Sequence, residues 1–288
     1  MRALPETVLE KRSLSGALIF SEGLGAGLGW RLVVVAGRVI AATEGSLVSL
    51  ALDGSGRVEE TRFGARGLAA FGGELAVGTF GSTGAITRVD PVTLSARGEL
   101  AAVGAPIHTL ARVTDEVLAS SDSDGRILLH EGGTSRELAK RAHAMVSIGV
   151  LRGGSMAAAS LAKTIYVFHP QGGKRVWEGL TSIPYALAAH DDVVAAGVGK
   201  RVWLASAAST DAPRLLAAHE GIVSAVAFDA DGTLRSGGEE GWIHVWPPTA
   251  RGHGPEPAAS IPGRGEIRAI TVADDALFVL RQRSSHPV

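Results

Sequence analysis

The chain repeats one pattern of short apolar strands and turns along its length, and this repetition limits the available folds more than any other feature. Each copy has an apolar strand, a turn with Gly or Asp, a second apolar strand, another turn and a strand of alternating polarity. Aligned on the first residue of the innermost strand, the copies begin at Arg31, Arg66, His108, Ser147, Tyr185, Ser224 and Arg268. The spacings are 35, 42, 39, 38, 39 and 44 residues, the period of four-stranded blades around a central axis.

A fourth, more polar segment follows the copies and completes the blade. Examples are RVEETRF (57–63), ARGELAA (96–102), SRELAKR (135–141) and PRLLAAH (213–219). No segment keeps a 3.6-residue apolar period, so we expect no helix. The sequence therefore predicts an all-β fold in which residues 1–288 form a single seven-bladed β-propeller.

The last copy lacks two strands at the C-terminal end. Two spare strands, 7–14 and 17–21, precede the first full copy. Pairing them with the last copy would leave no open sheet edge. We therefore expect closure by two strands from each end, with a six- or eight-bladed ring as the alternative if the ends are read differently.

One copy carries a recognisable motif, AHEGIVSAVAFDADGTLRSGGEEGWIHVW (218–246). It resembles a repeat of the WD-repeat (tryptophan–aspartate) β-propeller family. The resemblance implies a hydrogen-bonded structural tetrad formed by His219, Ser236, Glu240 and Trp246, with Glu240 where the family has Asp and Pro247 where the family has its second name-giving residue. A Ser–His–acid catalytic set is the alternative, but we favour the structural role because buried polar groups need partners.

The motif is weaker in the other copies. In the third copy Ser120 and Asp124 match, and His130 stands at the Trp position. In the fourth copy His143 and Ser160 match. The repeat period thus extends the resemblance over the whole chain. The specific motif residues are found mainly in 218–246.

Composition excludes several classes of function. The net charge of −1 does not favour bulk binding of nucleic acid, and the absence of Cys removes disulfides, thiolate metal sites and thiol nucleophiles. No apolar run approaches the ~18 residues of a membrane span, and no secretion signal is evident. We expect a cytoplasmic protein with no membrane association, no metal and no cofactor.

Three short motifs match known binding or catalytic motifs only in part. The run GLGAGLG (23–29) lacks dinucleotide-binding spacing, and we expect a flexible connection there. SDSDG (121–125) lacks the further ligands of a calcium loop, so a tight turn is favoured. GGSMA (153–157) is a poor nucleophile elbow, and the nine His residues include no evident close ligand pair.

The aligned first residues of the copies should ring one mouth of the central channel. Arg31, Arg66 and Arg268 would join His108, Tyr185, Ser147 and Ser224 there, with no acid among the seven. The guanidinium group of arginine can donate two parallel hydrogen bonds to a carboxylate or a phosphate, and a concave mouth concentrates the electrostatic field of such groups. The ring is therefore a candidate partner-binding site; pairing with loop acids, or an alignment one residue out of register, is the alternative.

Two further features could contact a partner. The Pro-rich segment 247–265 is too long for a minimal connection, so we expect a protruding loop insertion with a diverged fourth strand. Trp177, Trp203 and Trp242 lie away from the repeat's Trp position. They are expected either at an interface or packed between blades.

These features favour a non-catalytic protein–protein interaction scaffold or recognition subunit of a multiprotein assembly. Its partner would be a protein or peptide, acidic where it meets the ring, such as a separately encoded effector or enzyme. One alternative is a sensor of a small phosphate ligand at the basic mouth. A lactonase- or quinoprotein-like propeller enzyme is less favoured, because the ring carries no carboxylate to hold a metal or cofactor.

Overall fold

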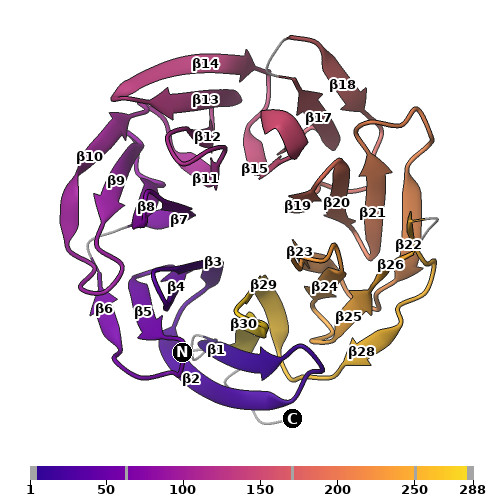
Figure 1. Ribbon diagram of the computed structural model, residues 1–288, viewed down its shortest axis with the longest axis horizontal. Coiled ribbons are helices and arrows are strands. Elements are labelled where there is room, and N and C mark those ends of the chain that lie inside the picture. The colour runs from indigo at the N-terminus through magenta and orange to yellow at the C-terminus, as the bar shows by residue number, and fades with distance from the viewer. Residues whose placement is uncertain (1–4, 62–63, 170–171, 250–251, 284–288) are drawn as a thin grey trace.

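Seven four-stranded antiparallel sheets stand in a ring in the computed structural model, which describes residues 5–61, 64–169, 172–249 and 252–283 (Figure 1). Each sheet has its innermost strand at the axis, and each inner strand contacts the inner strands of both neighbouring sheets. The fold is a seven-bladed β-propeller, which confirms the fold class that the repeat predicted.

The first three blades each follow the chain from the axis outward. Blade 1 contains β3 (Gly29–Val35), β4 (Arg38–Thr43), β5 (Leu47–Ala51) and β6 (Val58–Glu60); blade 2 contains β7 (Ala65–Phe71), β8 (Glu74–Thr79), β9 (Ala85–Val89) and β10 (Ala96–Ala102); blade 3 contains β11 (Ile107–Arg112), β12 (Leu118–Asp122), β13 (Arg126–Glu131) and β14 (Thr134–Lys140).

Blades 4 to 6 repeat this order. Blade 4 contains β15 (Met145–Val150), β16 (Met156–Ser160), β17 (Thr164–Phe168) and β18 (Lys174–Trp177); blade 5 contains β19 (Ala186–His190), β20 (Val193–Val198), β21 (Arg201–Ser206) and β22 (Arg214–Ala218); blade 6 contains β23 (Val223–Phe228), β24 (Leu234–Gly238), β25 (Ile243–Trp246) and β28 (Ala259–Ile261). A short 3₁₀ turn, Arg152–Gly154, joins β15 to β16. No helix among the described residues is long and apolar enough to cross a membrane.

Blade 7 is assembled from both ends of the chain. Its strands from the axis outward are β29 (Glu266–Ala273), β30 (Ala276–Arg283), β1 (Glu6–Ser13) and β2 (Leu18–Ala26). β1 pairs with β30 without a register shift, from Glu6 opposite Arg283 to Ser13 opposite Ala276. This is the arrangement that the spare N-terminal strands suggested, and it joins the two ends of the chain within one sheet.

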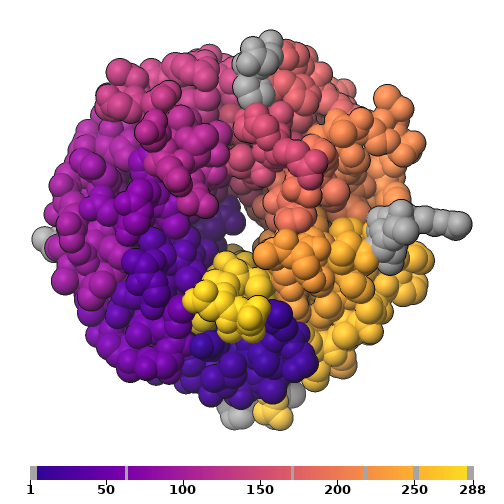
Figure 2. All heavy atoms as spheres, in the orientation of Figure 1, coloured from indigo at the N-terminus to yellow at the C-terminus, as the bar shows by residue number. Residues whose placement is uncertain are grey.

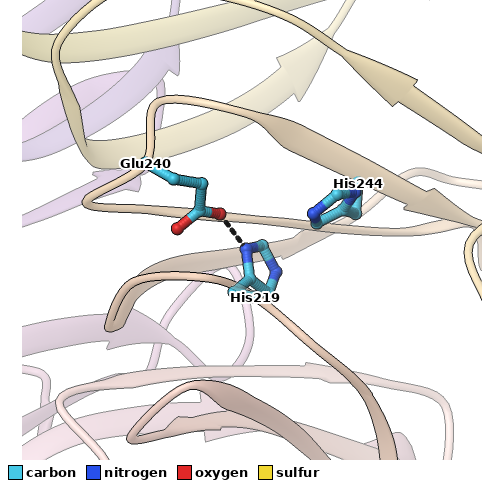
Figure 3. Close-up of side chains that lie close together, drawn as sticks. All are labelled: His219, Glu240 and His244. Atoms are coloured by element: carbon cyan, nitrogen blue, oxygen red, sulfur yellow. Dashed lines mark hydrogen bonds and ion pairs between the residues drawn. The ribbon is translucent and has the colours of Figure 1, made fainter.

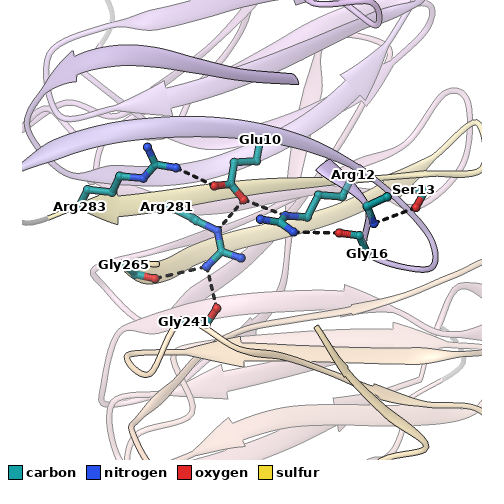
Figure 4. Close-up of polar contacts among 9 residues, drawn as sticks. Glu10, Arg12, Ser13, Gly16, Gly241, Gly265, Arg281 and Arg283 are labelled. Carbon is teal, nitrogen blue, oxygen red and sulfur yellow. Dashed lines mark hydrogen bonds and ion pairs between the residues drawn. The ribbon is translucent and has the colours of Figure 1, made fainter. Parts of the chain in front are cut away.

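A buried carboxylate holds this junction together (Figure 4). Glu10 on β1 is 2% exposed and accepts from Arg281 Nε at 2.7 Å, from Arg12 Nε at 2.9 Å and from Arg283 Nη2 at 2.9 Å. Burial alone would raise the pKa of Glu10, but the charges and hydrogen bonds of Arg281 and Arg12 hold it below its ordinary value of 4.5. Arg281 also donates to the carbonyl of Gly241, which ties blade 7 to blade 6.

The core consists of apolar clusters between neighbouring blades. Between blades 4 and 5, for example, Ile165 and Trp177 pack with Val194 and Trp203. The second strands carry many small buried residues, such as the run 157–159 of β16, where all three Ala are fully buried. Small side chains suit these strands because the wedge-shaped blades converge toward the axis.

Several local expectations need correction. The second N-terminal strand is longer than predicted and includes residues 23–26, so the glycine run is strand at both ends and not a flexible connection. The segment 247–265 does supply the fourth strand β28, and it also forms a small hairpin of β26 (Pro248–Thr249) and β27 (Gly252–His253). Residues 62–63 and 250–251, in two of the predicted segments, lie outside the described residues.

The glycine of the SDSDG motif shows why the turn at 121–125 is tight, as predicted. Asp122 is fully buried, and its Oδ1 accepts from the backbone N–H groups of Asp124 and Arg126. Gly125 has φ +76°, and a Cβ there would lie 2.2 Å from the carbonyl oxygen of Arg141. Only glycine therefore fits this turn.

We expect Glu10→Gln to destabilise the propeller by about 3 kcal/mol, because it leaves three arginines around a neutral side chain. Urea unfolding at pH 7 measures the effect. Glu22→Gln, on β2 of the same blade, removes an exposed pair with Arg57 and should change stability by less than about 0.5 kcal/mol. Equal effects of the two substitutions would contradict the role given to Glu10.

The contribution of Glu10 should also depend on pH in a defined direction. Its pKa is lowered in the folded protein, so its stabilisation is present above about pH 4.5 and is lost as the pH falls through the folded-state pKa. The difference in unfolding free energy between wild type and Glu10→Gln should therefore shrink between pH 6 and pH 3. A difference that stays constant over this range would show that the ionised carboxylate is not the cause.

Candidate functional site

A cavity of about 540 Å³ lies where the inner strands begin, at one end of the central opening that Figure 2 shows between the blades. We call it the channel-mouth cavity. It is lined by Gly29, Trp30, Arg31, Arg66, His108, Val146, Leu161, Tyr185, Ile222, Val223, Ser224, Glu239, Glu266 and Arg268. Its volume falls in the range of ligand pockets.

Six of the seven residues predicted to ring the mouth line this cavity, and Ser147 does not. The inner strands of six blades share a register shift near their start, which leaves one residue outside the regular pairing. In blade 4 that residue is Val146, whereas Ser147 pairs with Ala159 and is 3% exposed. In blade 1 it is Trp30, so the sequence alignment was one residue out of register in both blades. Arg31 still lines the cavity.

Aromatic side chains hold one arginine of the cavity in place. The guanidinium carbon of Arg66 lies 3.7 Å from the centre of the Phe80 ring and 4.3 Å from that of Trp30. Arg268 lies 5.9 Å from the Trp30 ring. Because guanidinium groups stack well on aromatic faces, Trp30 and Phe80 fix the position of Arg66.

The seven aligned positions include no acid, but the cavity that they line does. Glu266 and Glu239 also line the cavity. Glu266 pairs with Arg268 at 2.6 Å, and Glu239 accepts from the backbone N–H of Ile222 at 2.9 Å. Glu266, the first residue of β29, thus compensates the charge of Arg268, so pairing with a nearby acid, one of the alternatives for the ring, holds for this arginine.

Arg31 and Arg66 lack such compensation. Neither forms an ion pair with any residue that the structure describes, and the hydrogen bond from Arg31 Nη2 to the Val146 carbonyl is 3.4 Å long. Burial, followed by the charge of Arg66, lowers the pKa of Arg31. Burial also lowers the pKa of Arg66, which the more distant Glu44 partly offsets. The two cations are therefore partly buried beside the same cavity.

His108 reports this positive environment. Burial, followed by the charges of Arg66 and Arg31, lowers the pKa of His108 to about 4. Its Nε2 lies 3.1 Å from Ser123 Oγ, and its ring packs edge-on against Phe80. His108 is therefore neutral at pH 7. Its ring can donate one hydrogen bond and accept another, and it adds no charge to the cavity.

An apolar rim borders the same cavity on the side of blades 4 to 6. Tyr185 is 56% exposed, Ile222 is 47% exposed and Leu161 is 38% exposed, and all three line the cavity. Trp242, in the neighbouring turn after β24, is also exposed. We call Leu161, Tyr185 and Ile222 the apolar rim. Sequence reasoning missed Leu161 and Ile222, because they lie in loops outside the strand alignment.

The structure brings the four residues of the expected tetrad together. His219 Nε2 lies 2.7 Å from Ser236 Oγ, and Trp246 Nε1 donates to the same oxygen at 2.9 Å. His219 Nδ1 contacts Glu240 Oε1, and Glu240 Oε2 accepts from the N–H of Gly221. Trp246 is 1% exposed and Ser236 is fully buried. The set thus links β24 and β25 of blade 6 to the connection from blade 5, which carries His219, and to the turn after β24, which carries Glu240.

A second histidine, His244, lies beside the tetrad and was not expected there from the sequence. The ring of His244 lies 4.4 Å from that of His219, and His219, Glu240 and His244 form a cluster that could hold a metal ion (Figure 3). However, both ring nitrogens of His219 already have partners in the tetrad. A metal would have to replace the contact between His219 and Glu240, so the geometry favours the tetrad.

The weaker copies form reduced versions of this arrangement. In blade 3, Ser120 Oγ lies 2.8 Å from His130 Nε2, so His130 does take the place of Trp. The buried acid there is Asp122, paired with Arg126 at 2.8 Å, whereas the predicted Asp124 is largely exposed. In blade 4 the side chain of His143 is exposed. The motif is therefore complete in blade 6 and partial in blades 3 and 4.

The three other tryptophans divide into two groups. Trp177 and Trp203 are buried between blades 4 and 5, with ring centres 5.0 Å apart. Trp242 is 43% exposed. Packing explains the first two, and only Trp242 is available to a partner.

We expect His219→Ala to lower the free energy of unfolding by about 2 kcal/mol, because it removes the hydrogen bonds of His219 to the buried Ser236 and the partly buried Glu240. Thermal unfolding measures the loss, and partner binding should persist. His143→Ala, in the corresponding loop of blade 4, is the control and should leave the melting temperature unchanged. An unchanged melting temperature in His219→Ala would count against a structural tetrad.

The low pKa of His108 gives a second test. Titration of its ring signals by NMR should yield a value of about 4. Removing one neighbouring charge with Arg66→Gln should move this pKa upward, toward 6.5. Arg112→Gln, at the far end of β11 where Arg112 pairs with Asp115, should leave it in place.

No family model matches the sequence, and no curated protein matches it. Among solved structures, the chain is similar to the WD40 β-propeller domain of Doa1, with 16% sequence identity and a TM-score of 0.69. The similarity covers 90% of this chain and 94% of that one. At this identity the likeness shows the fold alone, a β-propeller.

Proposed function

We propose that the chain is a protein-interaction module that binds a partner protein or peptide at the channel mouth. The observation that carries this proposal is the apolar rim: Leu161, Tyr185 and Ile222 are all exposed at the edge of one cavity. Exposed apolar groups gathered on one surface mark interaction sites more often than single ones do. A closed ring of sheets also holds the loops that carry them rigidly, which lowers the entropy cost of binding.

The likeness to the WD40 propeller of Doa1 supports a role in protein interaction at this coarse level. We extend it to a non-catalytic recognition subunit that works beside a separately encoded effector in the cytoplasm. That extension is an analogy from the fold.

The contacts at the mouth support binding over catalysis. Its two acids are engaged, Glu266 by Arg268 and Glu239 by a backbone N–H. A metal- or cofactor-dependent propeller enzyme would need acids, Asn or His converging on one point. The channel mouth instead offers the neutral His108 and, among the described residues, two arginines without an ion pair, Arg31 and Arg66. Those arginines favour one second candidate, a sensor of a small phosphate ligand.

Photo-crosslinking from the channel mouth tests the proposal. We replace Tyr185 by p-benzoylphenylalanine and irradiate cells of the native host. The expected result is a crosslink to one discrete protein, which Ile222→Ser reduces because it removes part of the apolar rim. Leu215, equally exposed on the outer strand of the same blade, is the matched control position and should give no such crosslink.

Equal crosslinking from positions 185 and 215 would contradict binding at the mouth. A mouth that crosslinks to no protein while the purified chain binds inorganic phosphate would replace the interaction module with the sensor.

A further inference from the structure

The channel-mouth cavity has an uncompensated charge on one side and the apolar rim on the other. Two guanidinium groups, those of Arg31 and Arg66, face a cavity of about 540 Å³ without an ion pair among the described residues. Like charges placed together in a partly buried site are unfavourable, and proteins tolerate them where an anion is received. The pair therefore points to a ligand and not to a stabilising role in the free protein.

The geometry of Arg66 suits a planar acceptor. Its guanidinium is held between Trp30 and Phe80 at 4.3 and 3.7 Å. A stacked guanidinium keeps its edge free, and that edge can donate two parallel N–H bonds to a carboxylate or a phosphate. Little side-chain entropy remains to be lost on binding.

Charge balance favours a single negative charge. The lining contains three arginines and two glutamates, and His108 is neutral because its pKa is about 4. The lining therefore carries a net charge of +1, which one carboxylate neutralises. A dianionic phosphate would leave the cavity with excess negative charge beside Glu239 and Glu266.

The apolar rim adds the second requirement. Leu161, Tyr185 and Ile222 are exposed on the blade 4 to 6 side of the same cavity, and the arginines lie on blades 1, 2 and 7. A ligand that satisfies both sides needs an acidic group next to apolar side chains. A peptide segment provides both within a few residues.

We infer that the channel-mouth cavity binds an acidic peptide segment, with an Asp or Glu carboxylate received by Arg31 and Arg66 and a flanking apolar side chain seated on the apolar rim. This inference rests on the proposed function and names the chemistry of the partner. It assigns the carboxylate to the arginine side and the apolar neighbour to blades 4 to 6.

Short capped peptides test this directly. The probes are three equimolar pools of acetylated, amidated peptides of the form Ala-Φ-Z-Φ-Ala, where Φ is Leu, Phe or Val and Z is Glu, Gln or phosphoserine. Binding to the purified full chain is measured by calorimetry at low salt, and the NMR signals of His108 report occupancy. A bound carboxylate should raise the pKa of His108 above about 4, because it offsets the charges of Arg66 and Arg31.

The Glu pool should bind at least about tenfold more tightly than the Gln pool, since the neutral amide loses the charge-assisted bonds. Arg66→Gln should weaken the Glu pool by about tenfold or more and should leave the Gln pool unchanged. Arg66→Lys, which keeps the charge but not the fork, should give an intermediate loss. Arg112→Gln, at the opposite end of the channel, is the control and should bind as wild type does. Melting curves verify that each variant is folded.

Four outcomes would overturn the inference. They are no binding of the Glu pool, equal binding of the Glu and Gln pools, a Glu pool indifferent to Arg66→Gln in a folded variant, and a phosphoserine pool that binds about tenfold more tightly than the Glu pool. The last outcome would assign the arginines to a phosphate group. None of these four outcomes changes the crosslinking expected from position 185, so the proposed function can stand while this inference fails.

Discussion

The seam between β1 and β30 is the interaction on which the rest of the ring depends. All other blades are formed by consecutive strands, apart from the small hairpin that precedes β28, and each could in principle form locally. Blade 7 requires residues 271 positions apart to meet, because Glu10 and Arg281 join there at 2.7 Å with both side chains almost completely buried. Without this junction blades 6 and 1 would each lose the neighbour against which they pack, and the inner strands would no longer enclose a channel.

The sequence predicted the architecture because each repeat of the sequence corresponds to one four-stranded blade. Strand length, turn residues and a spacing near 40 residues are set by the blade itself, so they could be read without knowledge of contacts between blades. The tetrad of blade 6 was accessible for the same reason, since His219 and Trp246 belong to one repeat. The Glu10 network was not, because its partners come from opposite ends of the chain and no periodic signal links them.

The mouth was harder to predict, for a physical reason that particular residues illustrate. An extra residue near the start of most inner strands shifts the pairing by one, and the alternation of apolar and polar residues does not reveal its position. Ser147 was therefore placed at the mouth where Val146 lies. Glu239 and Glu266 were missed because they lie outside the aligned strand starts. Once folded, the inner strands bring Arg31, Arg66 and Arg268 to one opening, which leaves a basic side facing an apolar one.

The direction of the seam has a mechanical consequence. In the antiparallel pair of β1 and β30, Glu6 lies opposite Arg283, so the two outgoing ends of the chain leave from the same end of the seam. A force that pulls these ends apart acts across the strands and loads the hydrogen bonds one after another, as in opening a zipper. Tension applied at the two ends of the chain should therefore open this seam at a lower force than a pull along the strands, which would load all its hydrogen bonds together.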